Sequence, residues 1–145
     1  MVVVSDSTTL IILENQNRFD LLTNLFERVF IPQAVWDEIH SKEGFVLPNF
    51  ITLSPIEATD ELSTLLYLLD RGESEAIVLA KTKNLPLVID EKKGRKIASA
   101  MGISIVGLLG VIYLNIKRGF ITVQEAGVFL DQARTNGFRI SQKLI

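Results

Sequence analysis

The chain has 145 residues, of which 48% are hydrophobic, and its formal net charge is −2. This composition argues against disorder and fits one domain with a real core. Because there is no cysteine, disulfides and thiolate zinc sites are excluded, and the single histidine, His40, excludes a histidine-rich metal site. A uniformly basic surface is excluded as well, so contact with phosphate requires a local basic patch or a bound cation.

Neither a signal peptide nor a membrane span is predicted. The first residues lack a basic segment followed by a long apolar run. The most apolar stretch, 103–116, is shorter than the roughly 20 residues that cross a bilayer, and two glycines interrupt it. We therefore expect a cytoplasmic protein. Its mean hydropathy of +0.31 predicts an apolar face covered by a partner or by a second copy, which favours a homodimer.

In the first half of the chain, β-branched runs alternate with helical patterns. Asp6 and the Ser-Thr-Thr after it are typical of a helix start, and Pro32 fits the first position of a helix. The predicted elements are a strand at 2–5, a helix that opens at 6–9 and continues over 10–13, a helix over 18–26, a strand at 29–31, a helix over 32–40, a strand at 50–53 and a helix over 60–69.

The second half continues the alternation. Arg71-Gly72 predicts a break before the next helix, Gly102 and Gly119 predict two helix ends, and Thr122 predicts the cap of the last helix. The predicted elements are helices over 73–82, 91–101, 108–117 and 122–135, strands at 85–89 and 103–106, and an edge strand at 137–140. Continuously apolar strands between helices predict one α/β domain, 1–145, with a parallel sheet covered on both faces.

Acidic residues gather near the predicted strand ends. They are Asp6, Glu38, Glu73, Glu75, Asp90 and Glu91. Asp6 and Asp90 directly follow strands, and ligands of open α/β sheets bind beyond the carboxyl ends of strands. Carboxylates attract hard cations such as Mg²⁺ or Mn²⁺, which activate water and neutralise charge on a phosphodiester.

Each acidic residue also has a purely structural interpretation. Asp6 and Asp90 fit helix N-caps, and the glutamates near helix starts complement the helix dipole. Glu38 stands four residues before Lys42, at the spacing of a surface ion pair. The argument for a metal site therefore depends on the joint placement of these residues.

Several ordered segments resemble the PIN-domain superfamily, which includes the VapC-type toxin ribonucleases. The resemblance is greatest to a PIN-like family described as predicted nucleic-acid-binding proteins. It covers almost the whole chain, through the segments 4–11, 31–39, 69–77, 88–91, 94–95, 106–111 and 137–141.

The resemblance implies a three-layer α/β/α sandwich with a central, mainly parallel sheet. It implies a Mg²⁺- or Mn²⁺-dependent endoribonuclease that cleaves single-stranded RNA, as the toxin-like component of a toxin–antitoxin pair with an antitoxin protein as partner. By position, the catalytic acids are Asp6, Glu38, Glu75 and Asp90. The metal ligands are Asp6, Asp90, Glu75 and Glu91, with Glu73 as a further assistant.

Two positions depart from the family pattern. Glu91-Lys92 replaces an Asp-Arg pair, and Leu108 stands where a threonine is frequent. A catalytically weak or inactive PIN-fold module that binds nucleic acid or protein is therefore the alternative. A phosphotransfer domain and a dinucleotide-binding domain rank lower, because the Asp-x-Asp pair and the Gly-x-Gly-x-x-Gly segment are missing.

Basic residues follow Asp90 directly. Lys92, Lys93 and above all Arg95 are predicted to contact RNA phosphates, although a solvated helix face explains the same pattern. Trp36 suits either base stacking or the core, and its apolar neighbours favour the core. His40 is expected at the surface without a catalytic role.

Overall fold

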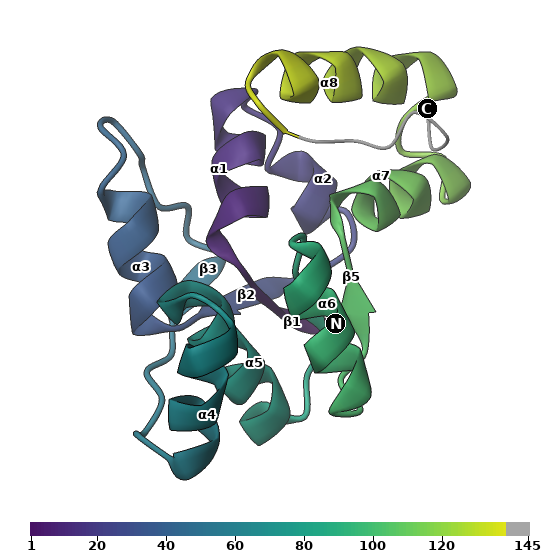
Figure 1. Cartoon of the computed structure of the whole chain (residues 1–145). Helices are drawn as coiled ribbons and strands as arrows, with labels where there is room; N and C mark the ends of the chain where they lie inside the picture. The colour runs from purple at the N-terminus through teal and green to yellow at the C-terminus, as the bar shows by residue number, and fades with distance from the viewer. Residues whose placement is uncertain (139–145) are drawn as a thin grey trace.

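Five short parallel strands form the central sheet of the computed structural model, which describes residues 1–138 (Figure 1). The strands are β1 (Val2–Ser5), β2 (Arg28–Ile31), β3 (Ile51–Leu53), β4 (Leu87–Val88) and β5 (Ile105–Val106). Their order is β3-β2-β1-β4-β5, with Val3 opposite Val29 and Val4 opposite Leu87. The chain moves outward from β1 in one direction and from β4 in the other, so the topological switch point lies between them.

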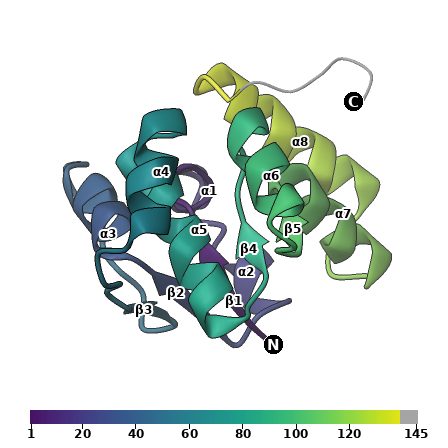
Figure 2. The same ribbon diagram turned by 60° about the horizontal axis from the view of Figure 1, so that its bottom comes forward.

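Helices connect and cover the strands. They are α1 (Ser7–Asn15), α2 (Asp20–Thr23), α3 (Gln33–His40), α4 (Asp60–Leu68), α5 (Arg71–Lys83), α6 (Lys92–Ala100), α7 (Leu108–Lys117) and α8 (Val123–Thr135). Figure 2 shows α5 between α4 and α6. None of the helices in residues 1–138 combines the length and the apolar character that a bilayer crossing requires.

The sheet separates two apolar cores because successive strand side chains point to opposite faces. Val3 and Val29 pack with residues of α1, α2, α3, α7 and α8. Val4 and Leu87 pack with residues of α4, α5 and α6. This arrangement confirms the predicted three-layer α/β/α sandwich, and the sheet formed by the described strands is parallel throughout.

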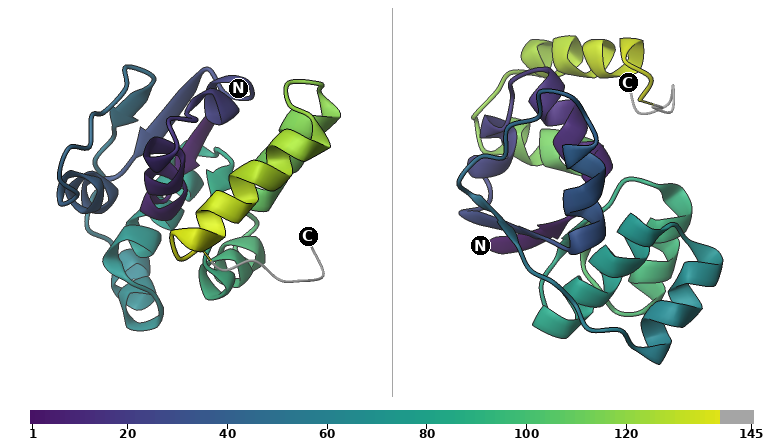
Figure 3. Two further views of the ribbon diagram at one scale, coloured as in Figure 1. Left: turned by 90° about the horizontal axis from the view of Figure 1, so that it is seen from above. Right: turned by 90° about the vertical axis from the view of Figure 1, so that its left-hand side faces the viewer.

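The last helix forms an outer layer over α7 (Figure 3). Thr122 and Glu125 form a reciprocal capping box at its start, as the predicted cap at Thr122 requires. Gln16, at the end of α1, donates a hydrogen bond to the carbonyl of Phe129 at 3.0 Å. α8 is thereby held over the α1 side of the sheet.

Several predicted boundaries were wrong. The helix expected over 18–26 is only α2, and α5 begins at Arg71 instead of after Gly72, because Asp70 caps it by accepting from the Glu73 N–H. β4 is shorter than the predicted strand over 85–89. Pro86 lies outside β4, although its carbonyl accepts a hydrogen bond from the Val4 N–H. Residues 137 and 138 are not a strand, and the rest of the predicted edge strand lies outside the described residues.

A buried amide joins α2 to α7. The Asn115 side chain is fully buried and donates to the carbonyls of Leu21 and Val111 at 2.9 and 2.8 Å. It also accepts from the Asn24 amide at 2.9 Å. The carbonyl of Leu21, a buried residue of the short helix α2, depends on this side chain for a partner.

We expect Asn115→Ala to lower the free energy of unfolding by about 2 kcal/mol, because it leaves the Leu21 carbonyl buried and unpaired. Asn24→Ala, which removes only the outer hydrogen bond, should cost clearly less. Urea unfolding followed by circular dichroism measures both values. Equal losses in the two variants would contradict this account of the buried amide.

Candidate functional site

Asp6 links the carboxyl ends of β1 and β4 at the switch point. Its N–H donates to the Val88 carbonyl at 2.9 Å. Its Oδ2 accepts from the Asp90 N–H at 3.0 Å, and its Oδ1 accepts from the Thr9 N–H at 3.2 Å as the N-cap of α1. Asp6 therefore has the expected capping role and, in addition, connects two strands.

The Asp6 carboxyl is almost completely enclosed, with 4% of the residue exposed. Burial, followed by the nearby charge of Asp90, raises its pKa to about 7, and the hydrogen bonds from the Thr9 and Asp90 backbone oppose this shift. Ionised Asp6 is thus held in a site that disfavours its charge. A positive group beside it would be stabilising.

A cavity of about 110 Å³ opens beside Asp6, and we call it the acid cavity. Besides two hydroxyl residues, it is lined by five carboxylates from four parts of the fold. The lining residues are Asp6, Ser7, Thr8, Glu38, Asp70, Glu73 and Glu91. The fold thus brings together Asp6, Glu38 and Glu91 of the predicted site with the predicted assistant Glu73, and it adds Asp70.

Glu38 reaches the acid cavity from α3. Its Oε2 accepts from the Ser7 hydroxyl at 2.7 Å, instead of pairing with Lys42 as a surface residue would. Gly72 makes the approach possible, since a Cβ at this position would collide with the Glu38 carboxylate. Burial raises the pKa of Glu38, and the hydrogen bond from Ser7 partly opposes the shift.

Glu73 carries the least compensated oxygen of the site. Its Oε2 is buried and has no hydrogen-bond donor among the described residues. Burial first, and then contacts with the acidic side chains of Asp70 and Glu91, raise its pKa to about 8. Glu91 has the opposite shift, because the Gly94 N–H, at 2.7 Å from its Oε2, holds its pKa below the usual value. Several carboxylates therefore lie close together here with too few hydrogen-bond donors.

Asp90 faces a second, larger hollow. This cavity of about 790 Å³, which we call the basic groove, is lined by Asp90 and Glu91 and by three cationic side chains, Lys42, Lys92 and Arg95. Asp90 Oδ1 accepts from the Leu108 N–H at 3.0 Å. Burial raises the pKa of Asp90, and this N–H together with the charge of Arg95 opposes the shift.

Gly107 leaves the space in which Arg95 and Asp90 approach. A Cβ at this glycine would lie 2.8 Å from Arg95 Nη1 and 3.3 Å from Asp90 Oδ1. The Leu108 side chain is fully buried, so this residue contributes only its N–H to the site. Because Gly107 has no side chain, Arg95 can lie next to the carboxylate of Asp90.

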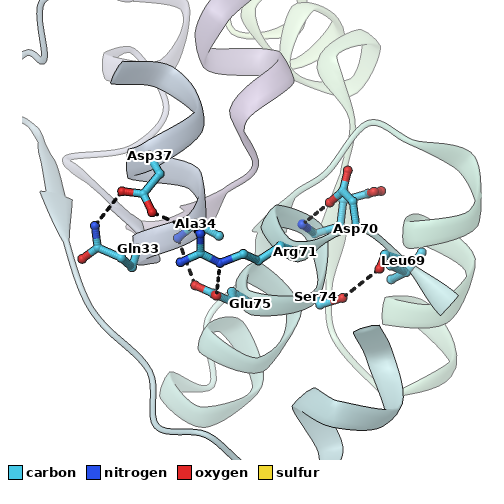
Figure 4. A network of polar contacts seen from close by, with 9 residues as sticks. Gln33, Ala34, Asp37, Leu69, Asp70, Arg71, Ser74 and Glu75 are labelled. Atoms are coloured by element: carbon cyan, nitrogen blue, oxygen red, sulfur yellow. Dashed lines mark hydrogen bonds and ion pairs between the residues drawn. The ribbon is translucent and has the colours of Figure 1, made fainter. Parts of the chain in front are cut away.

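Glu75 lies away from the acid cavity. Its Oε1 accepts from the Ala34 N–H at 3.0 Å, and its Oε2 accepts from Arg71 at 3.1 Å (Figure 4). Arg71 also contacts Asp37 at 3.2 Å, so the network joins the starts of α3 and α5. Glu75 thus supports the helix that carries Glu38, and its charge contributes to the raised pKa of Glu38, but it does not line the acid cavity.

The remaining predicted residues fall into two groups. Lys92 and Arg95 line the basic groove, and Lys93 lines a neighbouring hollow. Trp36 packs against the core and stacks on His40 with ring centroids 4.1 Å apart, which agrees with the core interpretation. The sequence offered one signal for the missed residue Asp70, namely an aspartate three residues before Glu73 at capping distance.

A family model described as a PIN domain matches residues 2–145. The chain belongs to the PIN-domain family. This membership agrees with the α/β/α sandwich and gives the protein a nuclease-like fold. A search of curated proteins finds no match.

PIN domains usually use divalent cations, and the donors in this PIN domain suit such ions chemically. The acid cavity offers carboxylate oxygens, the ligands that Mg²⁺ and Mn²⁺ prefer, and the donor-free Glu73 oxygen would gain from a cation. Within residues 1–138, however, no three or more acidic, histidine or cysteine side chains already have an arrangement that could hold an ion. Binding would require the glutamate side chains to turn.

We expect Glu75→Ala to lower the free energy of unfolding by about 1–3 kcal/mol, because the Ala34 N–H at the start of α3 loses its acceptor. Glu75→Gln keeps an oxygen for this N–H and should cost less. Chemical unfolding monitored by fluorescence of Trp36, on the same helix, compares them. A variant with alanine that is as stable as the wild type would contradict the supporting role.

We expect the metal-free protein to lose stability between about pH 4 and pH 8. In the folded protein, the pKa values of Asp6 and Glu73 are raised to about 7 and about 8. Protonation of these two groups therefore stabilises the folded state, fully so below their pKa values in the unfolded chain. This contribution is lost as the pH rises through their pKa values in the folded protein. Urea midpoints across this range in EDTA test the prediction. Midpoints that rise steadily with pH would contradict it.

Proposed function

We propose that this PIN domain is a metal-dependent endoribonuclease that cleaves single-stranded RNA at the acid cavity. The observation that carries the proposal is the buried, donor-free oxygen of Glu73 among four further carboxylates. Such an excess of acceptors over donors is costly unless a proton or a cation compensates it. A divalent cation would supply an activated water and would neutralise charge on the phosphodiester.

The carboxylates closest to the switch point would hold the cation. Asp6 is fixed by two backbone N–H groups, and Glu73 and Glu91 adjoin it from the starts of α5 and α6. Asp90 is free to use its second oxygen, because only Oδ1 is engaged by Leu108 in the described structure. Glu75 is assigned to positioning α3, although its predicted role as a ligand remains a matter for experiment.

Glu38 and Arg95 would act on the substrate from opposite sides. Glu38 is oriented by the Ser7 hydroxyl, and burial raises its pKa, which makes it a better acceptor of a proton from water. Arg95 lies beside Asp90 in the basic groove, where its guanidinium can bind a phosphate that approaches the acids. This pairing of acids with one close arginine supports phosphodiester chemistry.

A toxin role is the finer part of the proposal. It rests on the resemblance to the VapC-type ribonucleases, and with it come an antitoxin partner, a homodimer and a cytoplasmic location. Exposed apolar side chains such as Leu66, Tyr113 and Val128 are compatible with a protein partner. These statements remain predictions.

One observation favours a second candidate function. Because no group of acids in residues 1–138 is arranged to hold a metal ion as it stands, the protein could be a PIN-fold module that binds nucleic acid or protein without turnover. The buried Leu108 at the threonine position agrees with this alternative. The two functions differ in whether Mn²⁺ binds and whether RNA is cleaved.

We expect purified protein to cleave a mixed RNA pool in Mn²⁺ or Mg²⁺ and to stop when EDTA is added. Asp90→Asn should reduce the rate roughly 10²–10⁴-fold, the usual contribution of a group positioned for the reaction. The amide oxygen of the new residue still accepts from the Leu108 N–H, so the fold is retained. Gel analysis of labelled RNA measures the rates.

Asp131→Asn is the matched control, because Asp131 is an exposed acid on α8 that lines neither cavity. It should cleave like the wild type. Equal cleavage by Asp90→Asn would identify a contaminating nuclease. Absence of cleavage, together with absence of Mn²⁺ binding by calorimetry, would establish the non-catalytic alternative.

A further inference from the structure

Three hollows of the surface adjoin one another. Glu91 lines the acid cavity, the basic groove and a third cavity of about 330 Å³, which we call the tyrosine hollow. Asp70 and Glu73 also line both the acid cavity and the tyrosine hollow, while Thr8 lines both the acid cavity and the basic groove. The acid cavity therefore lies between two larger openings.

The tyrosine hollow combines an aromatic ring with a cation. Tyr67, near the end of α4, is 92% exposed, although a tyrosine ring is usually at least partly covered. Lys93, near the start of α6, lines the same hollow. The fold thus presents an uncovered ring next to a positive charge and beside the acids.

The basic groove has the same combination on the other side. Phe138 lines it and is only partly buried, packed at its other side against the core. Lys42, Lys92 and Arg95 line the groove with it, from the loop after α3 and from α6. An aromatic ring and at least one cation are therefore present in each of the two hollows that adjoin the acid cavity.

We infer that Tyr67 and Phe138 form two base-stacking subsites for one RNA strand that crosses the acid cavity. Aromatic rings bind the faces of unpaired bases, and nearby Lys and Arg bind the backbone phosphates. The strand enters over one ring and leaves over the other, so the phosphate between them passes Asp6 and Asp90. This inference rests on the proposed function and makes the enzyme an endonuclease that needs nucleotides on both sides of the cut.

The charges favour nucleic acid over an acidic peptide. The basic groove has three cations beside Asp90 and Glu91, and the tyrosine hollow has one cation, Lys93, beside three carboxylates that it shares with the acid cavity. A strand of RNA fits these charges when its outer phosphates meet the cations of the two hollows and a divalent cation bridges its central phosphate to the acids. A duplex does not, because its bases are stacked and cannot reach the rings.

The test is binding of a fluorescent single-stranded RNA, followed by anisotropy with Ca²⁺ as the divalent cation, so that binding is read apart from cleavage. Tyr67→Ala and Phe138→Leu should each weaken binding by roughly five- to a hundredfold, the loss expected for one stacked base. Tyr67→Trp should restore affinity. Tyr113→Ala is the control, since Tyr113 is 60% exposed on α7 and lines none of the three hollows.

The same variants are then assayed for cleavage of RNAs that extend on one or both sides of the cut. The inference predicts a higher KM and a nearly unchanged kcat for Tyr67→Ala, and no effect of this variant on substrates that lack nucleotides on its side. Cleavage that depends on Asp90 but is indifferent to both rings would overturn the subsites and leave the nuclease intact. Ring-dependent binding without any cleavage would support the subsites and refute the nuclease.

Binding of the matching RNA duplex gives the last comparison. It should be weaker than binding of the single strand and insensitive to Tyr67→Ala. A duplex that binds as well as the single strand, with the same loss in the variant, would overturn the proposed stacking. Loss of folding in Phe138→Leu is monitored by circular dichroism, and the exposed Tyr67 keeps the inference testable in that case.

Discussion

The carboxylate of Asp6 is the constraint from which the site is built. It accepts one N–H from the start of α1 and one from Asp90, so it joins the ends of two neighbouring strands at the switch point of the sheet. This position buries it, and burial raises its pKa to about 7. The other acids are brought to it by helices that begin at the same edge of the sheet, so charge accumulates where the strands diverge.

Glu73 and Glu75 differ in the donors that surround their carboxylates. Glu75 has both oxygens engaged by protein groups, Ala34 and Arg71, and it stabilises the start of α3. Glu73, two residues earlier on the same helix, has a buried oxygen without a donor in the described part of the chain. Residues two apart on a helix point in different directions, and this difference separates a structural acid from one that is open to a cation.

Two glycines allow the site to close. At Gly72 a side chain would displace the Glu38 carboxylate, and at Gly107 it would displace Arg95 and Asp90. Both glycines have ordinary negative φ values, so an unusual backbone conformation does not require them. They are needed because another residue approaches closely. Glu38 of α3 and Arg95 of α6 thus reach the sheet edge only because Gly72 and Gly107 have no side chains.

Alternating apolar runs and capping residues were enough to predict a parallel sheet covered on both faces, the caps at Asp6 and Thr122 and the presence of Asp6 and Asp90 at strand ends, because these signals are local in the chain. The start of α5 was predicted too late, because Arg71-Gly72 favoured a break and the spacing of Asp70 to Glu73, which marks the cap, was passed over. Sequence spacing could not decide which of Glu73 and Glu75 is open to a cation, because it places both in one helical turn. Only the tertiary structure decides it, because the direction of each side chain and the donors that meet it come from α3 and α6, which are distant in sequence.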